Sequence, residues 1–430
     1  MHSPSGRLPE HKHFQRACWL VVAGLIALPA MAQQNIPLTL AAAEDLALLD
    51  EPGYRALQAR AAALDEQAVI AGELPEPSLR LGLNNFPIQS GGFSTEGMTN
   101  AAIGLRQAFP AGRSRDISTR QFELLSNEMS ENGEARRRAV LAATRNAWLD
   151  VYYWDTAHRL VSESRPLFDD LSSATRSLYA VGRKSQQDVL RADLELSRLD
   201  DRIIEIERQR ARARASLGEW IGINAGRPIA DGLPAWEQLP PLDEMQQSLS
   251  QHPSLRAADA LVDARGAGVE LAKERSKPRW ALDVGYSYRD SGPPSGMPRS
   301  DFVSVGVTVD LPFIRKRSVD SALSAALSER SAAKSERERM HRSLLGKLAA
   351  EYAHWSDLGR RLALYDSRIL AQTQSNAEAS LLAYRSDRGD FADVMRAYID
   401  DLNARIDHVR LKVERAQTYA VLASLGGIPR

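Results

Sequence analysis

The stretch that decides the fold is a pair of segments, 279–289 (RWALDVGYSYR) and 302–311 (FVSVGVTVDL). In both, apolar residues alternate with small or polar residues, and a β-strand directs successive side chains to opposite faces. Each segment is therefore predicted to be a strand with one apolar and one polar face. Residues 290–301 between them are rich in Gly, Pro and Ser, which predicts a hairpin. A strand of about ten residues is long enough to cross a bilayer at a tilt.

The composition of the chain limits its function. The chain has 430 residues and a formal net charge of zero at pH 7, which gives no electrostatic indication of a nucleic-acid partner. Charged residues make up 26% of the chain and aromatic residues 6%, a balance typical of long solvated helices. After the N-terminal region the sequence has no run of about 18 apolar residues, so no transmembrane helix is expected.

The N-terminal region, 1–32, is predicted to be a secretory signal peptide. A basic start precedes the short apolar run 19–28, and residues 30–32, Ala-Met-Ala, supply a small-residue cleavage site. An apolar run of about ten residues is too short to span a membrane. The single cysteine, Cys18, comes before the apolar run rather than after it. We therefore expect a mature protein without a lipid anchor and without disulfides.

Landmarks recur in the same order in the two halves of the chain, which predicts a duplication. The segment Pro52–Ala56 resembles Pro253–Ala257, 201 residues later, and Asp188–Ala192 resembles Asp393–Ala397, 205 residues later. The expected organisation is a signal peptide at 1–32, a first repeat at 33–223, a linker at 224–241 and a second repeat at 242–430.

Each repeat is predicted to contain helices, two strands and a long helical hairpin. The strands are expected at about 78–86, 100–109, 279–289 and 302–311. Continuous helical runs are expected at 112–180 and at about 316–384, each followed by a turn and a return helix with apolar residues at coiled-coil spacing. The predicted fold class is mostly α-helical, with a long α-helical coiled-coil barrel and four β-strands per chain.

The four strands suit a small membrane β-barrel, because unpaired strand edges cannot be hydrated inside a bilayer. One chain cannot close such a barrel, since about eight strands are the practical minimum. Two copies or three copies of the chain both satisfy this requirement. The alternative is a soluble sheet packed on helices, but the glycine-rich polar face and the secretion signal favour the barrel. The side chains expected to face lipid are Trp280, Leu282, Val284, Tyr286, Val303, Val305, Val307 and Val309.

This plan of two repeats, each with a membrane hairpin inside a long coiled coil, resembles the TolC family of outer-membrane efflux proteins. The residues that carry the resemblance are 75–77 (Pro-Glu-Pro), 106–110 (Arg-Gln-Ala-Phe-Pro), 179–182 (Tyr-Ala-Val-Gly) and 188–190 (Asp-Val-Leu). The end of the second strand is also similar to the CzcC-like heavy-metal branch.

The resemblance implies a homotrimer with a twelve-stranded barrel, continued by a helical barrel through the periplasm. It implies a location in the outer membrane of a Gram-negative bacterium. The implied partners are outer-membrane lipid, a periplasmic adaptor (a membrane fusion protein) and an inner-membrane pump, expected to be of the RND type. The implied function is passive conduction of substrates from the pump to the outside.

Candidate functional residues lie at the two turns of the helical hairpins. The gate candidates are Asp393, Tyr384, Arg388 and Asp188, and the residues expected to dock the adaptor are Gly182, Ala192, Gly389 and Ala397. The resemblance implies that Asp393 and Tyr384 form the entrance constriction and that Asp188 is a locking partner, although Asp387 stands where the family has a glycine. An Asp at a helix start is equally consistent with a helix cap. The sequence leaves gate and cap open for Asp188 and Asp393.

The sequence offers no catalytic constellation. It contains no HExxH, GxSxG or Walker pattern, and its eight histidines are scattered. We therefore expect no enzyme activity, no cofactor and no metal site. The competing interpretation is a soluble periplasmic coiled-coil adaptor or scaffold, which has no need of strands with apolar faces.

Overall fold

A computed structural model describes residues 36–430 except 50, 237, 291–298, 387 and 427–430. The predicted signal peptide, Cys18 and Asp387 lie outside the described residues. The described chain forms two compact units. One contains the residues up to Ala47, Ala143–Ala235 and Arg360–Gln417, and the other contains Leu48–Ala142, Trp236–Gly359 and the chain from Thr418. Each unit contains residues from both halves of the chain, so the two units do not correspond to the two sequence repeats. The repeats therefore remain a prediction from the sequence.

The elements of the first half follow the predicted order. They are α1 (Leu40–Leu49), α2 (Pro52–Gly72), β1 (Ser78–Asn84), β2 (Asn100–Phe109), α3 (Ser114–Ala180), α4 (Gln186–Ile221) and a 3₁₀ turn, η2 (Gly222–Gly226). The second half contains α5 (Leu242–Ser248), η3 (Leu249–Gln251), α6 (Pro253–Glu274), β3 (Trp280–Tyr288), β4 (Phe302–Val309), η4 (Pro312–Arg315), α7 (Lys316–Leu364), α8 (Leu370–Arg385) and α9 (Phe391–Gly426). The described part of the chain is mostly helical and contains four strands, as predicted.

The helices before the two hairpins begin in the same way. In α2, Pro52 occupies the first turn and the Glu51 side chain accepts a hydrogen bond from Tyr54 N at 2.5 Å. In α6, Pro253 occupies the first turn and His252 Nδ1 accepts from Ser254 N at 3.2 Å. Proline fits the first turn because the amide hydrogen that it lacks has no partner there.

The second long helix differs from the expectation of one continuous run. A π-helical turn at Tyr365–Ile369 separates α7 from α8, and Leu370 N bonds to Tyr365 O. The first long helix, α3, continues through Pro166. With the offset of 205 residues that aligns the turns, Pro166 corresponds to Ala371, just beyond the π turn. Both helices therefore depart from regular i→i−4 bonding at corresponding positions.

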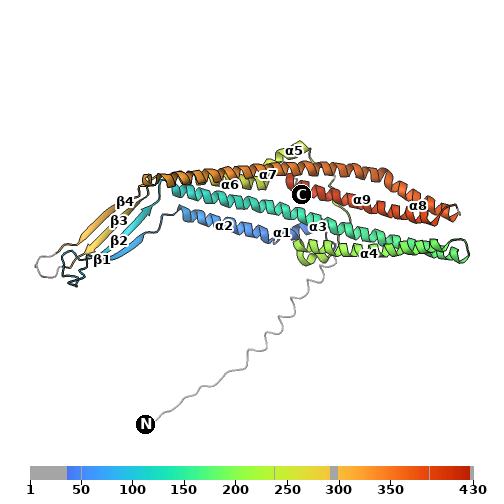
Figure 1. Ribbon diagram of the computed structural model, residues 1–430, viewed down its shortest axis with the longest axis horizontal. Helices are drawn as coiled ribbons and strands as arrows, with labels where there is room; N and C mark the ends of the chain where they lie inside the picture. The colour runs from blue at the N-terminus through green and yellow to red at the C-terminus, as the bar shows by residue number, and fades with distance from the viewer. Residues whose placement is uncertain (1–35, 50, 237, 291–298, 387, 427–430) are drawn as a thin grey trace, which may run out of the picture. The chain divides into compact units, whose positions relative to one another are not determined.

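The four strands form one antiparallel sheet in the order β1-β2-β3-β4 (Figure 1). The register places Leu105 opposite both Leu79 and Val284, and Val284 opposite Val305, so these four residues form one row across the sheet. The strands lie within two residues of the predicted bounds, because a period of two marks a strand clearly. Strands β1 and β4 are the two edges of the sheet.

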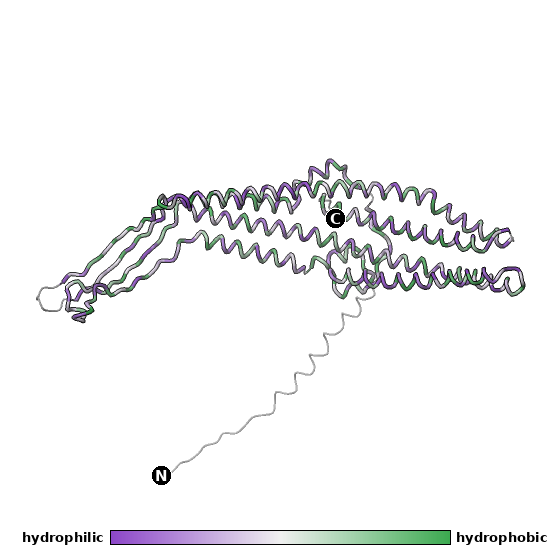
Figure 2. Tube along the Cα trace, viewed as in Figure 1, coloured by the Kyte–Doolittle hydropathy of each residue, from purple (hydrophilic) through white to green (hydrophobic). Residues whose placement is uncertain are grey.

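The two faces of the sheet differ in chemistry. Polar and apolar residues are interleaved along the strands (Figure 2). All eight side chains expected to face lipid lie on one face, and all but the half-buried Leu282 are exposed, from Val303 at 73% to Trp280 and Tyr286 at 43%. The opposite face is lined mainly by small residues, with Gly104 directly opposite Gly285, and carries one ion pair, Arg106 with Asp283 at 3.9 Å.

The start of the described chain is fastened within its own unit. Leu38 pairs with Ile229 in a parallel bridge. Leu38 N donates to Pro228 O at 2.7 Å, and Trp148 Nε1 of α3 donates to Leu38 O at 2.9 Å. Leu38 and Trp148 are both buried. Through these contacts the segment before α1 packs against α3 and against the linker after α4.

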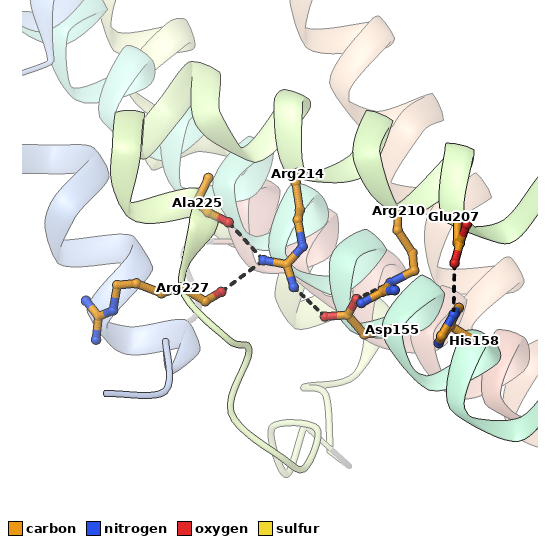
Figure 3. Close-up of polar contacts among 7 residues, drawn as sticks. All are labelled: Asp155, His158, Glu207, Arg210, Arg214, Ala225 and Arg227. Carbon is orange, nitrogen blue, oxygen red and sulfur yellow. Dashed lines mark hydrogen bonds and ion pairs between the residues drawn. The ribbon is translucent and has the colours of Figure 1, made fainter. Parts of the chain in front are cut away.

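A cluster of charged side chains fastens α4 to α3 in the same unit (Figure 3). Asp155 accepts hydrogen bonds from Arg210 and from Arg214, each at 2.8 Å. The other side of the Arg214 guanidinium donates to Ala225 O and Arg227 O at 3.1 and 3.0 Å. Arg214 therefore joins α3, α4 and the linker. The bond of Arg210 to Asp155 explains how this residue, which lies off the apolar pattern of α4, is accommodated.

The other unit has its own apolar core. Met245, Leu249, Leu348, Leu422 and Leu425 form one buried cluster from α5, η3, α7 and α9. In the part of the chain that the structure describes, no helix is long and apolar enough to cross a bilayer.

Candidate functional site

The first hairpin turn, between α3 and α4, is held by two local motifs. Gly182 has φ of +77°, its N–H donates to Tyr179 O at 2.9 Å, and Arg183 N donates to Leu178 O at 2.9 Å. This pair of bonds is a Schellman motif, in which glycine adopts the left-handed conformation without strain.

Asp188 takes part in the cap of α4. Its backbone N–H donates to Ser185 Oγ at 3.2 Å, while Asp188 Oδ2 accepts from Ser185 N at 3.2 Å and from Ser185 Oγ at 2.8 Å. This reciprocal arrangement is a capping box. The contacts of Asp188 therefore match the cap interpretation.

The second turn, between α8 and α9, repeats part of this geometry. Arg388 N donates to Ala383 O at 2.9 Å, the same i→i−5 bond as in the first turn. The Arg388 side chain is exposed. A Cβ built on Gly389 would lie 3.2 Å from Tyr384 N, so the backbone passes close to the end of α8 there. Asp393 is exposed and pairs with Arg396 one turn along α9 at 3.1 Å.

Tyr384 is the gate candidate that joins the two turns. Its side chain is 7% exposed and packs edge-on against Phe391, with ring centroids 5.7 Å apart. Lys184 of the first turn places Nζ 4.6 Å from the centre of the Tyr384 ring. The Tyr384 hydroxyl is buried and, among the described residues, has no hydrogen-bond partner.

The structure brings some of the predicted gate residues together and leaves others apart. Tyr384 meets the first turn through Lys184, whereas the side-chain bonds of Asp188 run to Ser185 and the ion pair of Asp393 runs to Arg396. Sequence reasoning missed Lys184, because nothing in its local sequence indicates a ring 200 residues away. The capping box was readable from the Ser-x-x-Asp spacing.

The four predicted docking residues fall into two groups. Gly182 is exposed, and a Cβ at this position would meet no atom within 4 Å. Gly389 is half-buried. Ala192 and Ala397 are buried, at 0% and 2% exposure. Their small side chains therefore serve helix packing in this structure, and only the glycine positions leave backbone accessible at the turns.

Two aspartates of α4 are paired with arginines of α3 along the first helical hairpin. Asp193 accepts from Arg176 at 2.6 Å and from Ser172 at 2.9 Å, and these bonds lower its pKa below the usual value. Asp200 accepts two bonds from Arg165, at 2.7 and 3.3 Å, which also lower its pKa. Both carboxylates stay ionised at neutral pH and link the two helices of the hairpin.

No metal-binding cluster accompanies these residues. Among the described residues, no group of three or more His, Cys, Asp or Glu side chains is placed to hold a metal ion. His408 pairs with Asp366 at 2.7 Å and His158 lies 3.7 Å from Glu207 (Figure 3), each with a single carboxylate.

Comparison with known sequences finds a family model and a curated relative that match this chain. The family model described as outer membrane efflux protein matches residues 245–427. A curated relative, Protein CyaE of Bordetella pertussis, is 26% identical over 423 residues, which cover 94% of this chain and 87% of that protein.

Solved structures with the same fold include three described as channels. The outer-membrane channel OprN has a TM-score of 0.76 at 19% identity, covering 90% of each chain. CusC, whose structures concern transmembrane channel formation, has a TM-score of 0.77 at 14% identity, covering 91% of this chain and 93% of that one. The open state of the MtrE outer membrane channel of Neisseria gonorrhoeae has a TM-score of 0.72 at 18% identity, covering 90% and 88%. At these identities the likeness establishes a shared fold.

Proposed function

We propose that the chain belongs to the outer membrane efflux protein family, whose model matches residues 245–427, and that it is the outer-membrane duct of a tripartite efflux system. In this proposal the duct passively conducts substrates from a periplasmic adaptor and an inner-membrane pump to the outside of a Gram-negative cell. The pump class that the family resemblance suggests is the RND type. We propose no catalytic activity and no cofactor.

The observation that carries the proposal is the exposed apolar face of the sheet. Every row across the sheet from Leu79 to Val309 presents mainly apolar side chains on this face, and Val303, Val305 and Val307 are more than 60% exposed. A contiguous exposed surface of this kind is unfavourable in water and favourable in hydrocarbon. A soluble periplasmic scaffold gains nothing from it, so the alternative function is not favoured.

The free edges of β1 and β4 support an assembly of several copies. The sheet order leaves both edges unpaired within the described chain, and a bilayer offers no water to satisfy them. Pairing β1 of one copy with β4 of the next satisfies both edges at once. Three copies give twelve strands, and the small residues of the opposite face then line an open lumen.

We further propose that the two helical turns form the periplasmic entrance. In this proposal Tyr384 and Lys184 hold the turns together in the resting state, and the exposed Asp393 supplies negative charge to the opening. Asp188 acts as a cap rather than as a lock, since its carboxylate is used by Ser185. The adaptor is proposed to dock at the turns through Gly182 and Gly389.

Membrane integration and conduction test the proposal directly. Membranes from cells that express the full chain are washed with sodium carbonate, and the detergent-purified protein is then added to a planar bilayer. The proposal expects the protein to stay with the outer-membrane fraction and to produce discrete current steps. Complete release by carbonate together with the absence of conductance would contradict it.

A further inference from the structure

An amphipathic hollow lies where the sheet meets the helices of its unit. It has a volume of about 990 Å³ and is bounded by the ends of β4 and α6 and by the start of α7. Its apolar wall includes Val309, Leu311 and Ile314, which are 48%, 51% and 73% exposed. Large aliphatic side chains with this exposure present apolar surface that the described residues leave uncovered.

The same hollow is lined by three basic residues, Arg275, Lys277 and Arg279. Lys277 pairs with Glu274 at 2.8 Å, and Arg279 pairs with Asp310 at 2.9 Å. Glu274 also accepts from Arg113 N at 2.9 Å. Among the described residues no carboxylate pairs with the exposed Arg275, so the hollow carries unneutralised positive charge. Further exposed basic residues nearby in the chain are Arg113, Lys273, Lys316 and Arg317.

The hollow continues the apolar face of the sheet. Trp280 is opposite Val309 in the register and stacks on Phe109 with ring centroids 4.0 Å apart. Tyr288 lies at the other end of β3, eight residue steps or roughly 26 Å from Trp280 at the rise of a strand. Aromatic side chains at both ends of an apolar band mark the two interfaces of a membrane. The hollow therefore lies at headgroup level on the helical side of the band.

We propose that this hollow binds an anionic phospholipid. This proposal rests on the proposed membrane function. The lipid phosphate accepts hydrogen bonds from Arg275 and Lys277, and an acyl chain covers Val309, Leu311 and Ile314. An arginine guanidinium matches phosphate geometry with two parallel donors, and a lysine ammonium adds a point charge. The apolar wall requires an occupant with a hydrocarbon part, which distinguishes a lipid from free phosphate.

Native mass spectrometry of the mature protein tests this proposal. The purified protein is incubated with phosphatidylglycerol or with phosphatidylcholine of the same acyl chains, and the retained lipid adducts are counted. The test variant is Arg275→Gln/Lys277→Gln, and the matched control is Arg339→Gln/Arg342→Gln, two exposed arginines of α7 outside the hollow. We expect wild type and control to retain phosphatidylglycerol preferentially. The test variant should bind it about 30-fold more weakly, at roughly fivefold per basic residue.

The outcomes separate the lipid site from the channel itself. Equal retention of phosphatidylglycerol by the test variant, or equal retention of both lipids by the wild type, overturns the lipid site while the oligomeric channel stands. A test variant that no longer forms the oligomer shows that the hollow is a contact between copies, which also overturns it. A wild-type chain that remains monomeric and does not integrate into membranes contradicts the proposed function and the lipid site together.

Discussion

Lys184 and Tyr384 lie 200 residues apart in the sequence, yet the ammonium of the first is 4.6 Å from the ring centre of the second. The contact connects the turn between α3 and α4 to the end of α8. A cation over an aromatic ring contributes about 0.5–2 kcal/mol, depending on how well water is excluded. Two conformations of a protein commonly differ by a few kcal/mol, so a contact of this size is large enough to shift the balance between two arrangements.

The first prediction is that Lys184→Gln raises the resting conductance, because the substitution removes the cation. Lys184→Arg should keep the resting value, since a guanidinium also binds an aromatic face. The measurement is single-channel current in a planar bilayer, with the neighbouring Arg183→Gln as the control. If Lys184→Gln and Lys184→Arg behave alike, the contact has no part in gating.

The second prediction concerns the Tyr384 hydroxyl, whose removal should lower the resting conductance rather than raise it. A buried hydroxyl without a partner costs about 1–3 kcal/mol, so the resting arrangement is less stable than its packing allows. Tyr384→Phe keeps the ring below Lys184 and removes this cost, and we expect fewer spontaneous openings. Tyr384→Ala removes the ring and should raise the resting conductance. More frequent openings in Tyr384→Phe would show that the hydroxyl stabilises the resting state.

The two aspartates at the turns should respond differently to the same substitution. Asp393→Asn removes exposed negative charge and should weaken both cation preference and block by a trivalent cation applied from the periplasmic side. Asp188→Asn should leave both unchanged, since the carboxylate of Asp188 serves the cap with Ser185. Reversal potentials in a salt gradient measure the preference. An unchanged selectivity in Asp393→Asn would place the constriction elsewhere.

Much of the fold was predictable from local pattern, and the contacts of the turns were not. The strands were located because Val303 to Val309 alternate with small or polar residues, and this signal is present in the sequence itself. The π turn at Tyr365–Ile369 has no such signal, since nothing in these residues distinguishes an i→i−5 bond from an i→i−4 bond. The Lys184–Tyr384 contact depends on how two hairpins pack, which residue spacing does not record.

The two faces of the sheet yield a fourth prediction. Val305→Arg places a charge on the apolar face and should prevent stable assembly, because arginine at the middle of a bilayer costs about 2–4 kcal/mol per chain. Ser304→Arg is the matched control, since Ser304 lies on the opposite face beside Gly285. Thr308 is a poorer control site because its hydroxyl lies 3.3 Å from Asp283. The readout is the amount of oligomer that resists detergent, and equal amounts in both variants would contradict the membrane face.

The buried His252 predicts a dependence of stability on pH. Burial lowers the pKa of His252, and the positive charge of Arg138 lowers it further. A hydrogen bond with the backbone of Ser424 raises the pKa and partly offsets these two effects. The folded protein therefore binds a proton less readily than the unfolded chain. The contribution of neutral His252 to the free energy of unfolding is fully present above the pKa of about 6.5 that histidine has in the unfolded chain. This contribution is lost as the pH falls toward and through the lower pKa of the folded state.

Protonation would also remove the Nδ1 lone pair that accepts from Ser254 N. His252→Asn keeps a capping acceptor and cannot be protonated in this range. Melting temperatures of wild type and variant between pH 8 and pH 5 test this prediction. We expect the wild type to lose more stability than the variant on acidification, and parallel curves would show that His252 does not titrate on unfolding.

Disulfide trapping between the two sheet edges tests the central claim most directly. Strands β1 and β4 are separated by two strands within one chain, or about 14 Å at the usual spacing, whereas a disulfide needs Cα atoms within about 7 Å. A cysteine at Leu79, Leu81 or Leu83 is therefore combined with one at Val303, Val305 or Val307, and the membrane-inserted protein is oxidised. A shared twelve-stranded barrel predicts a covalent trimer for the pairs in register, and none for the control pair Leu105→Cys/Val305→Cys. If every edge pair yields only monomer, the barrel is not shared between chains and the proposed duct is contradicted.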